Sequence, residues 1–391
     1  MNKMTAWLKA DACLPDRGAL VGRAWNVAAG GPSVVKIEAG TAVDITQSFA
    51  TMRDLCETGD PAAAARDAKG QSLGSLDAIL ANTAPGTRDP TKPWALAPID
   101  LQAIKAAGVT FAISMLERVI EERARGNPQA AVEIRASIED LIGDDLSKLK
   151  PGSAQAMALK KVLIEKGVWS QYLEVGIGPD AEIFTKNQVM AAVGHGMDAG
   201  LNPISSWNNP EPEVVVVVAS TGKIVGATLG NDVNLRDVEG RSGLLLGKAK
   251  DNNASCALGP FIRLFDDGFT LDHVRHMQLS LRVEGEDGYV LNGSSNMSKI
   301  SRDPADLVGQ MLNAHHQYPD GAVLFLGTLF APIEDRDVKG QGFTHKLGDI
   351  VTVSSKELGA LTNRMMATNV AEPWTFGVSH LMRNLAKRGL L

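Results

Sequence analysis

The stretch Pro210-Glu211-Pro212-Glu213-Val214-Val215-Val216-Val217-Val218 places two carboxylates directly before a run of five valines. A short run of β-branched apolar residues predicts a strand in the protein core. Residues two apart in an extended segment face the same way, so Glu211 and Glu213 should project side by side. Carboxylates this close repel one another unless a cation lies between them. Because Pro212 cannot donate to a sheet ladder, we expect the pair at a strand start or sheet edge.

The next predicted strand supplies a third acid. After the turn-like Ala219-Ser220-Thr221-Gly222, the chain continues as Lys223–Leu229 and reaches Gly230-Asn231-Asp232. A hairpin with its turn near Thr221 and Gly222 would bring Asp232 back beside Glu213. Three carboxylates without a soft ligand suit Mg²⁺, or Mn²⁺, rather than zinc. The spacing alone equally fits two solvated edge acids and a capping aspartate.

Composition narrows the class of protein. With 391 residues the chain is long enough for two domains, and its net charge of −6 gives no basic field for nucleic acid, which we therefore do not expect as a partner. The valine run is too short to span a bilayer, and charges interrupt residues 1–11 where a signal peptide would be apolar. Three scattered cysteines fit reduced thiols better than a disulfide framework. These features predict a cytoplasmic enzyme with no membrane attachment.

A proline-rich segment predicts the domain organisation. Residues 85–98 hold four prolines and are interpreted as a linker. It is included in a small β-rich N-terminal domain over residues 1–100, with short strands at Leu20–Trp25 and Ser33–Glu38. Residues 101–391 form the predicted catalytic domain. Within it, Met115–Arg125 is an amphipathic helix that Gly126-Asn127-Pro128 ends, further helical patterns continue to about Gly167, and strands dominate from Tyr172 onward.

An ordered set of short motifs resembles the fumarylacetoacetate hydrolase superfamily, and within it the 2-keto-3-deoxy-sugar-acid dehydratases. The likeness covers roughly residues 101–391 and comprises Glu182-Ile183-Phe184-Thr185-Lys186, Gly194-His195-Gly196, Pro210-Glu211-Pro212-Glu213, Gly230-Asn231-Asp232-Val233, Arg236-Asp237, Lys250, Gly259-Pro260 and Gly327-Thr328. The resemblance implies an α+β, β-rich fold, a mixed β-sandwich roll with a smaller N-terminal domain. It also implies that Glu211, Glu213 and Asp232 are the metal ligands.

The same resemblance implies two catalytic residues. Lys250 matches the lysine that removes a C3 proton from the substrate, and Glu182, placed on a lid segment rather than on the sheet, matches the acid that assists departure of the C4 hydroxyl. Near a divalent cation the pKa of Lys250 should fall, making it a neutral base. On sequence alone each could instead be a solvated side chain, and Lys248 would compete with Lys250.

Three further residues match substrate-binding positions of the family. Thr328 matches a residue that contacts the substrate carboxylate, and Arg236 matches an arginine of the substrate pocket. Lys186 belongs to the segment around Glu182 that follows the family pattern. Arg236 could equally be a buried partner of Asp237. Hydrolytic members carry a histidine shortly after an aromatic residue, whereas residues 108–118, which include Phe111, have none.

The predicted activity is Mg²⁺-dependent dehydration of a 2-keto-3-deoxypentonate, derived from D-xylonate or arabinonate, to 2-oxoglutarate semialdehyde. The missing histidine favours elimination over the alternative, an acylpyruvate-type carbon–carbon hydrolase or decarboxylase on the same scaffold. A metal-binding protein without turnover is a third interpretation. The family resemblance also predicts a homodimer or homotetramer.

Overall fold

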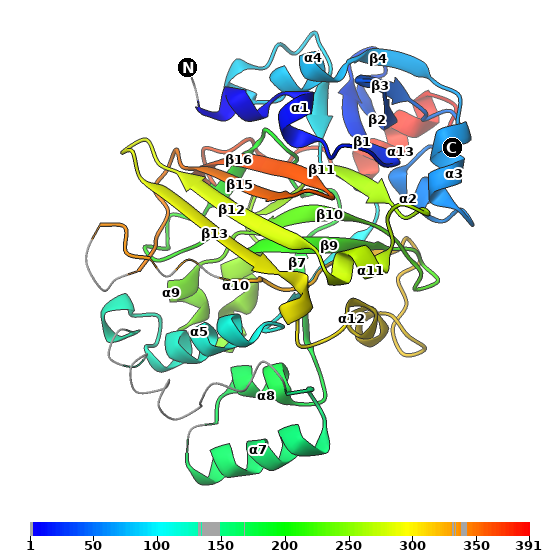
Figure 1. Cartoon of the computed structure of the whole chain (residues 1–391). Coiled ribbons are helices and arrows are strands. Elements are labelled where there is room, and N and C mark those ends of the chain that lie inside the picture. Colours follow the sequence, from blue (N-terminus) through cyan, green and yellow to red (C-terminus); the bar gives the residue numbers. More distant parts are fainter. Residues whose placement is uncertain are drawn as a thin grey trace.

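Two β-sheets packed face to face form the body of the protein, seen in a computed structural model (Figure 1). The structure describes residues 3–131, 134, 149–167, 169–330, 332, 334–337 and 342–391. The larger sheet has eleven strands in the order β4-β3-β2-β1-β11-β10-β9-β14-β6-β7, with β5 paired to β1, and the smaller has five in the order β13-β12-β15-β16-β8. Both sheets mix parallel and antiparallel pairs. The predicted β-rich mixed roll is confirmed.

The strands have the following bounds. They are β1 Leu20–Asn26, β2 Gly31–Glu38, β3 Thr41–Asp44, β4 Gln71–Ser75, β5 Trp94–Leu96, β6 Ala103–Gly108, β7 Glu182–Asn187, β8 Asp198–Leu201, β9 Pro212–Val218, β10 Ile224–Asp232, β11 Cys256–Leu264, β12 Gln278–Glu284, β13 Val290–Asn296, β14 Ala322–Phe325, β15 Ile350–Ser355 and β16 Gly359–Ala367.

Helices cover the ends and edges of the sheets. The α-helices are α1 Ala10–Cys13, α2 Met52–Cys56, α3 Pro61–Asp67, α4 Leu76–Ala81, α5 Ala112–Arg123, α7 Ala154–Glu165, α8 Gln171–Ile177, α9 Arg236–Glu239, α10 Leu246–Lys250, α11 Leu271–Arg275, α12 Pro304–Met311 and α13 Val378–Lys387. Short 3₁₀ turns are η1 Lys3–Trp7, η2 Pro85–Thr87, η4 Gly243–Leu245 and η5 Met297–Lys299. In the described part of the chain, no helix has the length and apolar character needed to cross a membrane.

The five valines of β9 are buried on both faces of the larger sheet. All five are 0% exposed, and they divide by the two-residue period of a strand: Val214, Val216 and Val218 join the core between the two sheets, while Val215 and Val217 join the core on the opposite face. The strand lies between β10 and β14 rather than at an edge. The valine run was therefore correctly predicted as core, and Pro212 is accommodated because it opens the strand.

The N-terminal strands continue the larger sheet instead of forming a separate one. β1 and β2 occur where the sequence predicts them, and β1 pairs antiparallel with β11. The proline-rich segment contains only η2 and the three-residue strand β5. The division into residues 1–100 and 101–391 stays a prediction.

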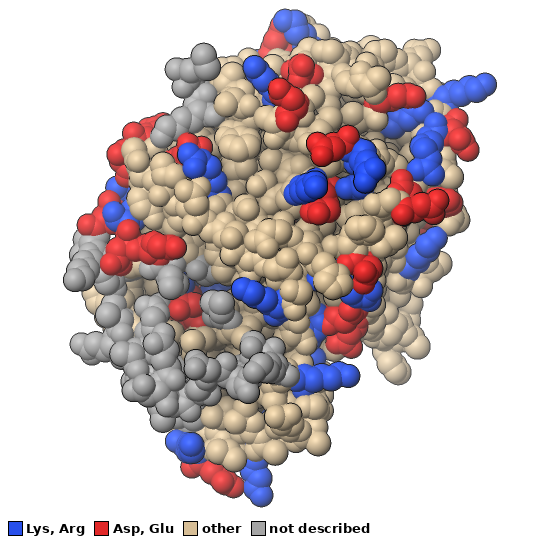
Figure 2. Space-filling model, in the orientation of Figure 1, with Lys and Arg blue, Asp and Glu red and all other residues tan. Residues whose placement is uncertain are grey.

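Helix α5 confirms the predicted amphipathic helix, and α7 confirms a second helical pattern before Gly167. The rest of the helical pattern predicted over residues 135–148 lies outside the described residues. The three cysteines are buried and free, as predicted. On the face shown in Figure 2, acidic and basic side chains are interspersed among other residues.

Candidate metal centre

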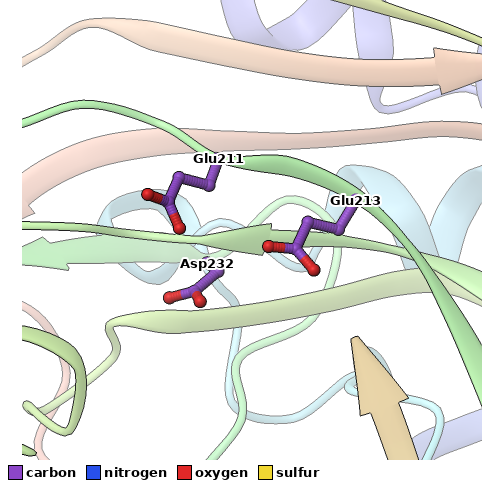
Figure 3. A group of neighbouring side chains, drawn as sticks. All are labelled: Glu211, Glu213 and Asp232. Atoms are coloured by element: carbon purple, nitrogen blue, oxygen red, sulfur yellow. The ribbon is translucent and has the colours of Figure 1, made fainter. Parts of the chain in front are cut away.

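Three carboxylates converge at the open end of the β9–β10 hairpin. β9 and β10 are antiparallel, and the chain reverses where Gly222 donates to the carbonyl of Ala219 (2.9 Å), so the predicted turn is confirmed. Asp232 lies opposite Glu211, its amide donating to the Glu211 carbonyl (3.0 Å), whereas Glu213 pairs with Gly230. One carboxylate oxygen from each of the three acids lies within 4.8 Å of the other two (Figure 3).

Two lysines contact these acids. The ammonium group of Lys250, the last residue of α10, lies 2.5 Å from Glu211 Oε2 and 3.1 Å from Asp232 Oδ2. Lys186 Nζ lies 3.0 Å from Asp232 Oδ1 and also donates to the backbone carbonyl of Lys250. Lys248 is exposed, whereas Lys250 is buried against the acids, and the catalytic role of Lys250 stays a prediction. Lys186 holds Asp232 and Lys250 in place, and direct contact with substrate stays a prediction.

The ion pairs set the charge of Lys250 and Asp232. Burial acts to lower the pKa of Lys250, but Asp232, Glu211 and Glu239 outweigh it and raise that pKa above its usual value. For Asp232, burial acts to raise the pKa and the two lysines bring it below the usual range. The expected neutral Lys250 therefore requires a cation that occupies its carboxylate partners.

Glu213 is the acid whose charge is left uncompensated. It is 1% exposed, and among the described residues it forms no ion pair. Its Oε2 accepts a hydrogen bond from the amide of Gly327 (2.7 Å). Burial, then Asp232 and Glu211, raise its pKa well above the usual value. An unpaired buried carboxylate beside two others, all hard oxygen donors, fits a divalent cation such as Mg²⁺.

The Gly327 contact depends on the absence of a side chain. Gly327 has φ +96°, a conformation that favours glycine, and a Cβ there would collide with Thr110. The neighbouring Thr328 is buried, and its hydroxyl donates to the carbonyl of Phe330 (2.8 Å). Thr328 therefore follows directly the residue that bonds to Glu213. Contact of Thr328 with a substrate carboxylate stays a prediction.

Helix α5 covers the acids with a second set of charges that the sequence reasoning missed. Arg118 bonds to Glu211 through Nη2, and its Nη1 lies 2.5 Å from Glu121 and 3.4 Å from Glu239. These four residues are 6% exposed or less. Burial opposes the charge of Arg118, but Glu121, Glu239 and Glu211 raise its pKa well above the usual value. The charged face of this amphipathic helix is buried, although the pattern alone indicates a solvated face.

Arg236 belongs to the same network. Its Nε donates to Glu121 (2.7 Å), its Nη2 to Glu117 (3.5 Å), and its Nη1 to the carbonyl of Pro332 (3.1 Å). Asp237 instead accepts from Ser205 and Ser206. The alternative that Arg236 pairs with Asp237 is wrong, because the side chain of Arg236 packs toward α5. Substrate binding by Arg236 stays a prediction.

Glu182 is the first residue of β7, which pairs with β6 in the larger sheet. The expectation that Glu182 lies on a lid rather than on the sheet is wrong, because it pairs with Gly108 of β6. Its carboxylate occupies the space above Gly108, where a Cβ would collide with it. Burial and Glu239 raise its pKa to about 7, against the opposing effect of Lys250. Glu182 also lines a cavity of about 520 Å³ with residues of α5, α8 and the segment 240–246.

All seven histidines lie in the described residues, and none bonds to Glu211, Glu213 or Asp232. His195, in the predicted Gly-His-Gly motif, is 1% exposed. It contacts the Trp7 carbonyl (3.0 Å) and accepts from the Thr362 amide (3.0 Å), and burial lowers its pKa to about 4. It holds η1 and β16 in place.

Residues 179–366, a little less than half of the chain, match the family described as "Fumarylacetoacetate (FAA) hydrolase C-terminal". Every residue of the metal centre that the sequence predicts lies within it. The resemblance predicted from the motifs is confirmed.

Two named relatives are dehydratases. The chain is 33% identical over 180 residues to a "2-dehydro-3-deoxy-D-arabinonate dehydratase" of Saccharolobus solfataricus, an alignment that covers 46% of this chain and 57% of the relative. It is 27% identical over 324 residues to a "Probable 2-keto-3-deoxyxylonate dehydratase" of Haloferax volcanii, covering 83% and 91%. The chain thus spans little more than half of the Saccharolobus protein.

Solved structures share the fold. A 2-keto-3-deoxy-D-arabinonate dehydratase in its apo form superposes with a TM-score of 0.61 at 21% identity, covering 89% of this chain and 99% of that one. The same enzyme complexed with magnesium and 2,5-dioxopentanoate gives 0.59. A fumarylacetoacetate hydrolase from Exiguobacterium antarcticum gives 0.55 at 14% identity, covering 89% and 99%.

Proposed function

We propose that this protein dehydrates a 2-keto-3-deoxypentonate to 2-oxoglutarate semialdehyde, with Mg²⁺ held by Glu211, Glu213 and Asp232. The observation that carries the proposal is the buried carboxylate cluster with Lys250 in contact with two of its members. The match of residues 179–366 to the family, and the relatives named as dehydratases, support the proposed class of substrate. When bound, the cation would polarise a 2-keto group and make its C3 protons more acidic.

Lys250 is the proposed base for the C3 proton. Its ammonium group lies at Glu211 and Asp232, the two acids that a cation would engage. With those carboxylates held by a cation, Lys250 would lose the ion pairs that keep it charged. Lys186 fixes the backbone of Lys250 through the Lys250 carbonyl and leaves the Lys250 side chain to reach the substrate.

Glu182 is the proposed acid for the leaving C4 hydroxyl. A carboxyl group with a pKa of about 7 is partly protonated at neutral pH, so it can give a proton to the hydroxyl and take one back afterward. The C3 proton goes to Lys250, and the C4 hydroxyl leaves as water with the Glu182 proton. The Glu182 carboxylate then accepts a C5 proton, and Lys250 returns its proton to C3. The resulting enol tautomerises to the aldehyde, and the net change is loss of one water.

The hydrolase alternative lacks the histidine that hydrolytic members of the family carry. None of the seven histidines bonds to the three carboxylates, and residues 108–118, which follow the family pattern around Phe111, include no histidine. The arrangement favours elimination over attack by water.

The test is an assay of the purified chain with Mg²⁺ against 2-keto-3-deoxy-D-xylonate, 2-keto-3-deoxy-D-arabinonate and an acylpyruvate, followed by NMR. We expect 2-oxoglutarate semialdehyde from at least one sugar acid and no cleavage of the acylpyruvate. Pyruvate release from the acylpyruvate without dehydration of either sugar acid would contradict the proposal.

A further inference from the structure

A second cavity lies where the N-terminal strands meet the C-terminal segment. It has a volume of about 420 Å³. Its walls come from β1, residues 88–97, residues 190–197, Asn253 and residues 372–380. None of the predicted metal or catalytic residues lines it, and most of its walls lie outside the family-matched residues 179–366. Cavities of this size hold small organic ligands.

Aromatic rings form one side of this cavity. Trp25 and Trp94 lie opposite each other in the β1–β5 pair, and their rings stack with centroids 5.3 Å apart and an interplanar angle of 11°. Phe376 meets Trp25 edge-on at 5.2 Å. Trp374, also in the lining, is 46% exposed. These aromatic rings give the cavity flat apolar surfaces against which a planar group of a ligand can pack.

A buried guanidinium group is the polar feature of the cavity. Arg23 is 7% exposed, and its Nε donates to the carbonyl of Ala97 (3.2 Å). Its Nη1 is buried without a hydrogen-bond partner, and no ion pair to Arg23 is found among the described residues. Burial lowers the pKa of Arg23 and Asp100 opposes this, but the Asp100 carboxylate accepts hydrogen bonds from the amides of Met52, Arg53 and Leu101. A buried cationic donor left without an acceptor is costly.

The other cationic side chain in the lining is already paired. Arg88 donates to both oxygens of Glu372 (2.9 and 3.0 Å) and to the carbonyl of Thr83, and its guanidinium lies 4.8 Å over the Trp94 ring. Glu372 neutralises Arg88, so Arg23 leaves one uncompensated positive charge at the cavity.

We propose that this cavity binds a small organic carboxylate with a flat apolar body, the carboxylate accepting from Arg23 and the body packing against Trp25, Trp94 and Trp374. The carboxylate faces the positive charge of Arg23, which lines the cavity, and the stacked indoles match a planar group. The site is separate from the metal centre and does not depend on the function proposed for it.

Indole-3-acetate and its amide, indole-3-acetamide, are matched probes that differ in charge and not in shape. Isothermal titration of the full chain in the presence of Mg²⁺ should give binding of the acid at least tenfold tighter than binding of the amide, because charge-assisted hydrogen bonds are the stronger ones. Equal affinity for the two probes, or no binding of the acid at millimolar concentration, would overturn the proposal.

Two substitutions locate the probe. Arg23→Met should weaken binding of indole-3-acetate at least tenfold, and Trp374→Ala, at a partly exposed position that spares the core, should weaken it several-fold. Arg383→Met, at an exposed position of α13 outside the lining, is the matched control and should leave binding unchanged. Glu213→Gln should also leave it unchanged. Loss of binding in Glu213→Gln with retention in Arg23→Met would place the probe at the metal centre and refute the cavity.

Discussion

The buried charge cluster has two halves that are built differently. The sheet half consists of Glu211, Glu213, Asp232, Lys186 and Lys250. The helix half consists of Arg118, Glu121, Arg236 and Glu239. In the sheet half, Glu213 is a buried acid with no ion pair among the described residues, whereas in the helix half the acids Glu121 and Glu239 face arginines at 3.4 Å or less. The difference indicates that the sheet half is arranged to receive a cation, while the helix half is arranged to be complete without one.

The largest expected effect comes from the sheet half. Glu213→Gln or Asp232→Asn removes a formal charge from the cation site, so Mg²⁺-dependent turnover should fall to background, and EDTA should do the same to the unaltered protein until Mg²⁺ or Mn²⁺ is restored. Asp267→Asn, at an exposed acid, is the control and should retain full turnover. Full activity in a preparation shown to be free of metal would break the distinction between the halves.

Substitution of a residue in the helix half should mainly lower the free energy of unfolding. Arg118→Ala leaves Glu211, Glu121 and Glu239 buried without their shared cation, and breaking a buried ion pair in this way costs about 3–5 kcal/mol. Arg123→Ala, at an exposed position on the same helix, should change the free energy of unfolding by less than about 0.5 kcal/mol. Urea unfolding of the two variants measures the difference. Equal stability would mean that the helix half contributes no buried pairing.

A smaller effect concerns Glu182, which lies between the halves. Its folded pKa of about 7 exceeds the usual 4.5, so the folded state favours the protonated form. Its contribution to stability is present below pH 4.5, is lost as the pH rises to about 7, and stays lost above it. Glu182→Gln should therefore raise stability relative to the unaltered protein by roughly 1–3 kcal/mol at pH 8 and by little at pH 4. A pH-independent difference would show that Glu182 titrates normally.

The sheet half could be predicted because its geometry is local. The two-residue period of a strand places Glu211 and Glu213 together, and a short hairpin returns Asp232 to them. The hairpin was expected to bring Asp232 beside Glu213, whereas Asp232 lies opposite Glu211 and Glu213 pairs with Gly230. Lys250 and Glu182 came from the family resemblance, and the register that aligns Gly259-Pro260 with the family favoured Lys250 over Lys248. The burial of Lys250 and the exposure of Lys248 are consistent with that choice, which stays a prediction.

The helix half could not be predicted in the same way. Arg118 reaches Glu211 across 93 residues of sequence, and only the packing of α5 onto the sheet brings them together. On a helix wheel Glu117, Arg118 and Glu121 look like a solvated face. Glu182 was placed on a lid by the family resemblance, and nothing local in the sequence shows that its strand pairs with β6. The oligomeric state, the cytoplasmic location and the domain division stay predictions.

Exchange of the substrate C3 hydrogens with deuterated solvent, followed by NMR in the presence of Mg²⁺, tests the central claim most directly. Lys250→Met should lose both exchange and dehydration by a hundredfold or more, while Lys248→Met, an exposed lysine two residues away, retains both. Glu182→Gln should block dehydration and retain C3 exchange, since proton removal precedes departure of the hydroxyl. Normal dehydration by Lys250→Met, or equal loss of exchange in the Lys250 and Glu182 variants, would contradict the account.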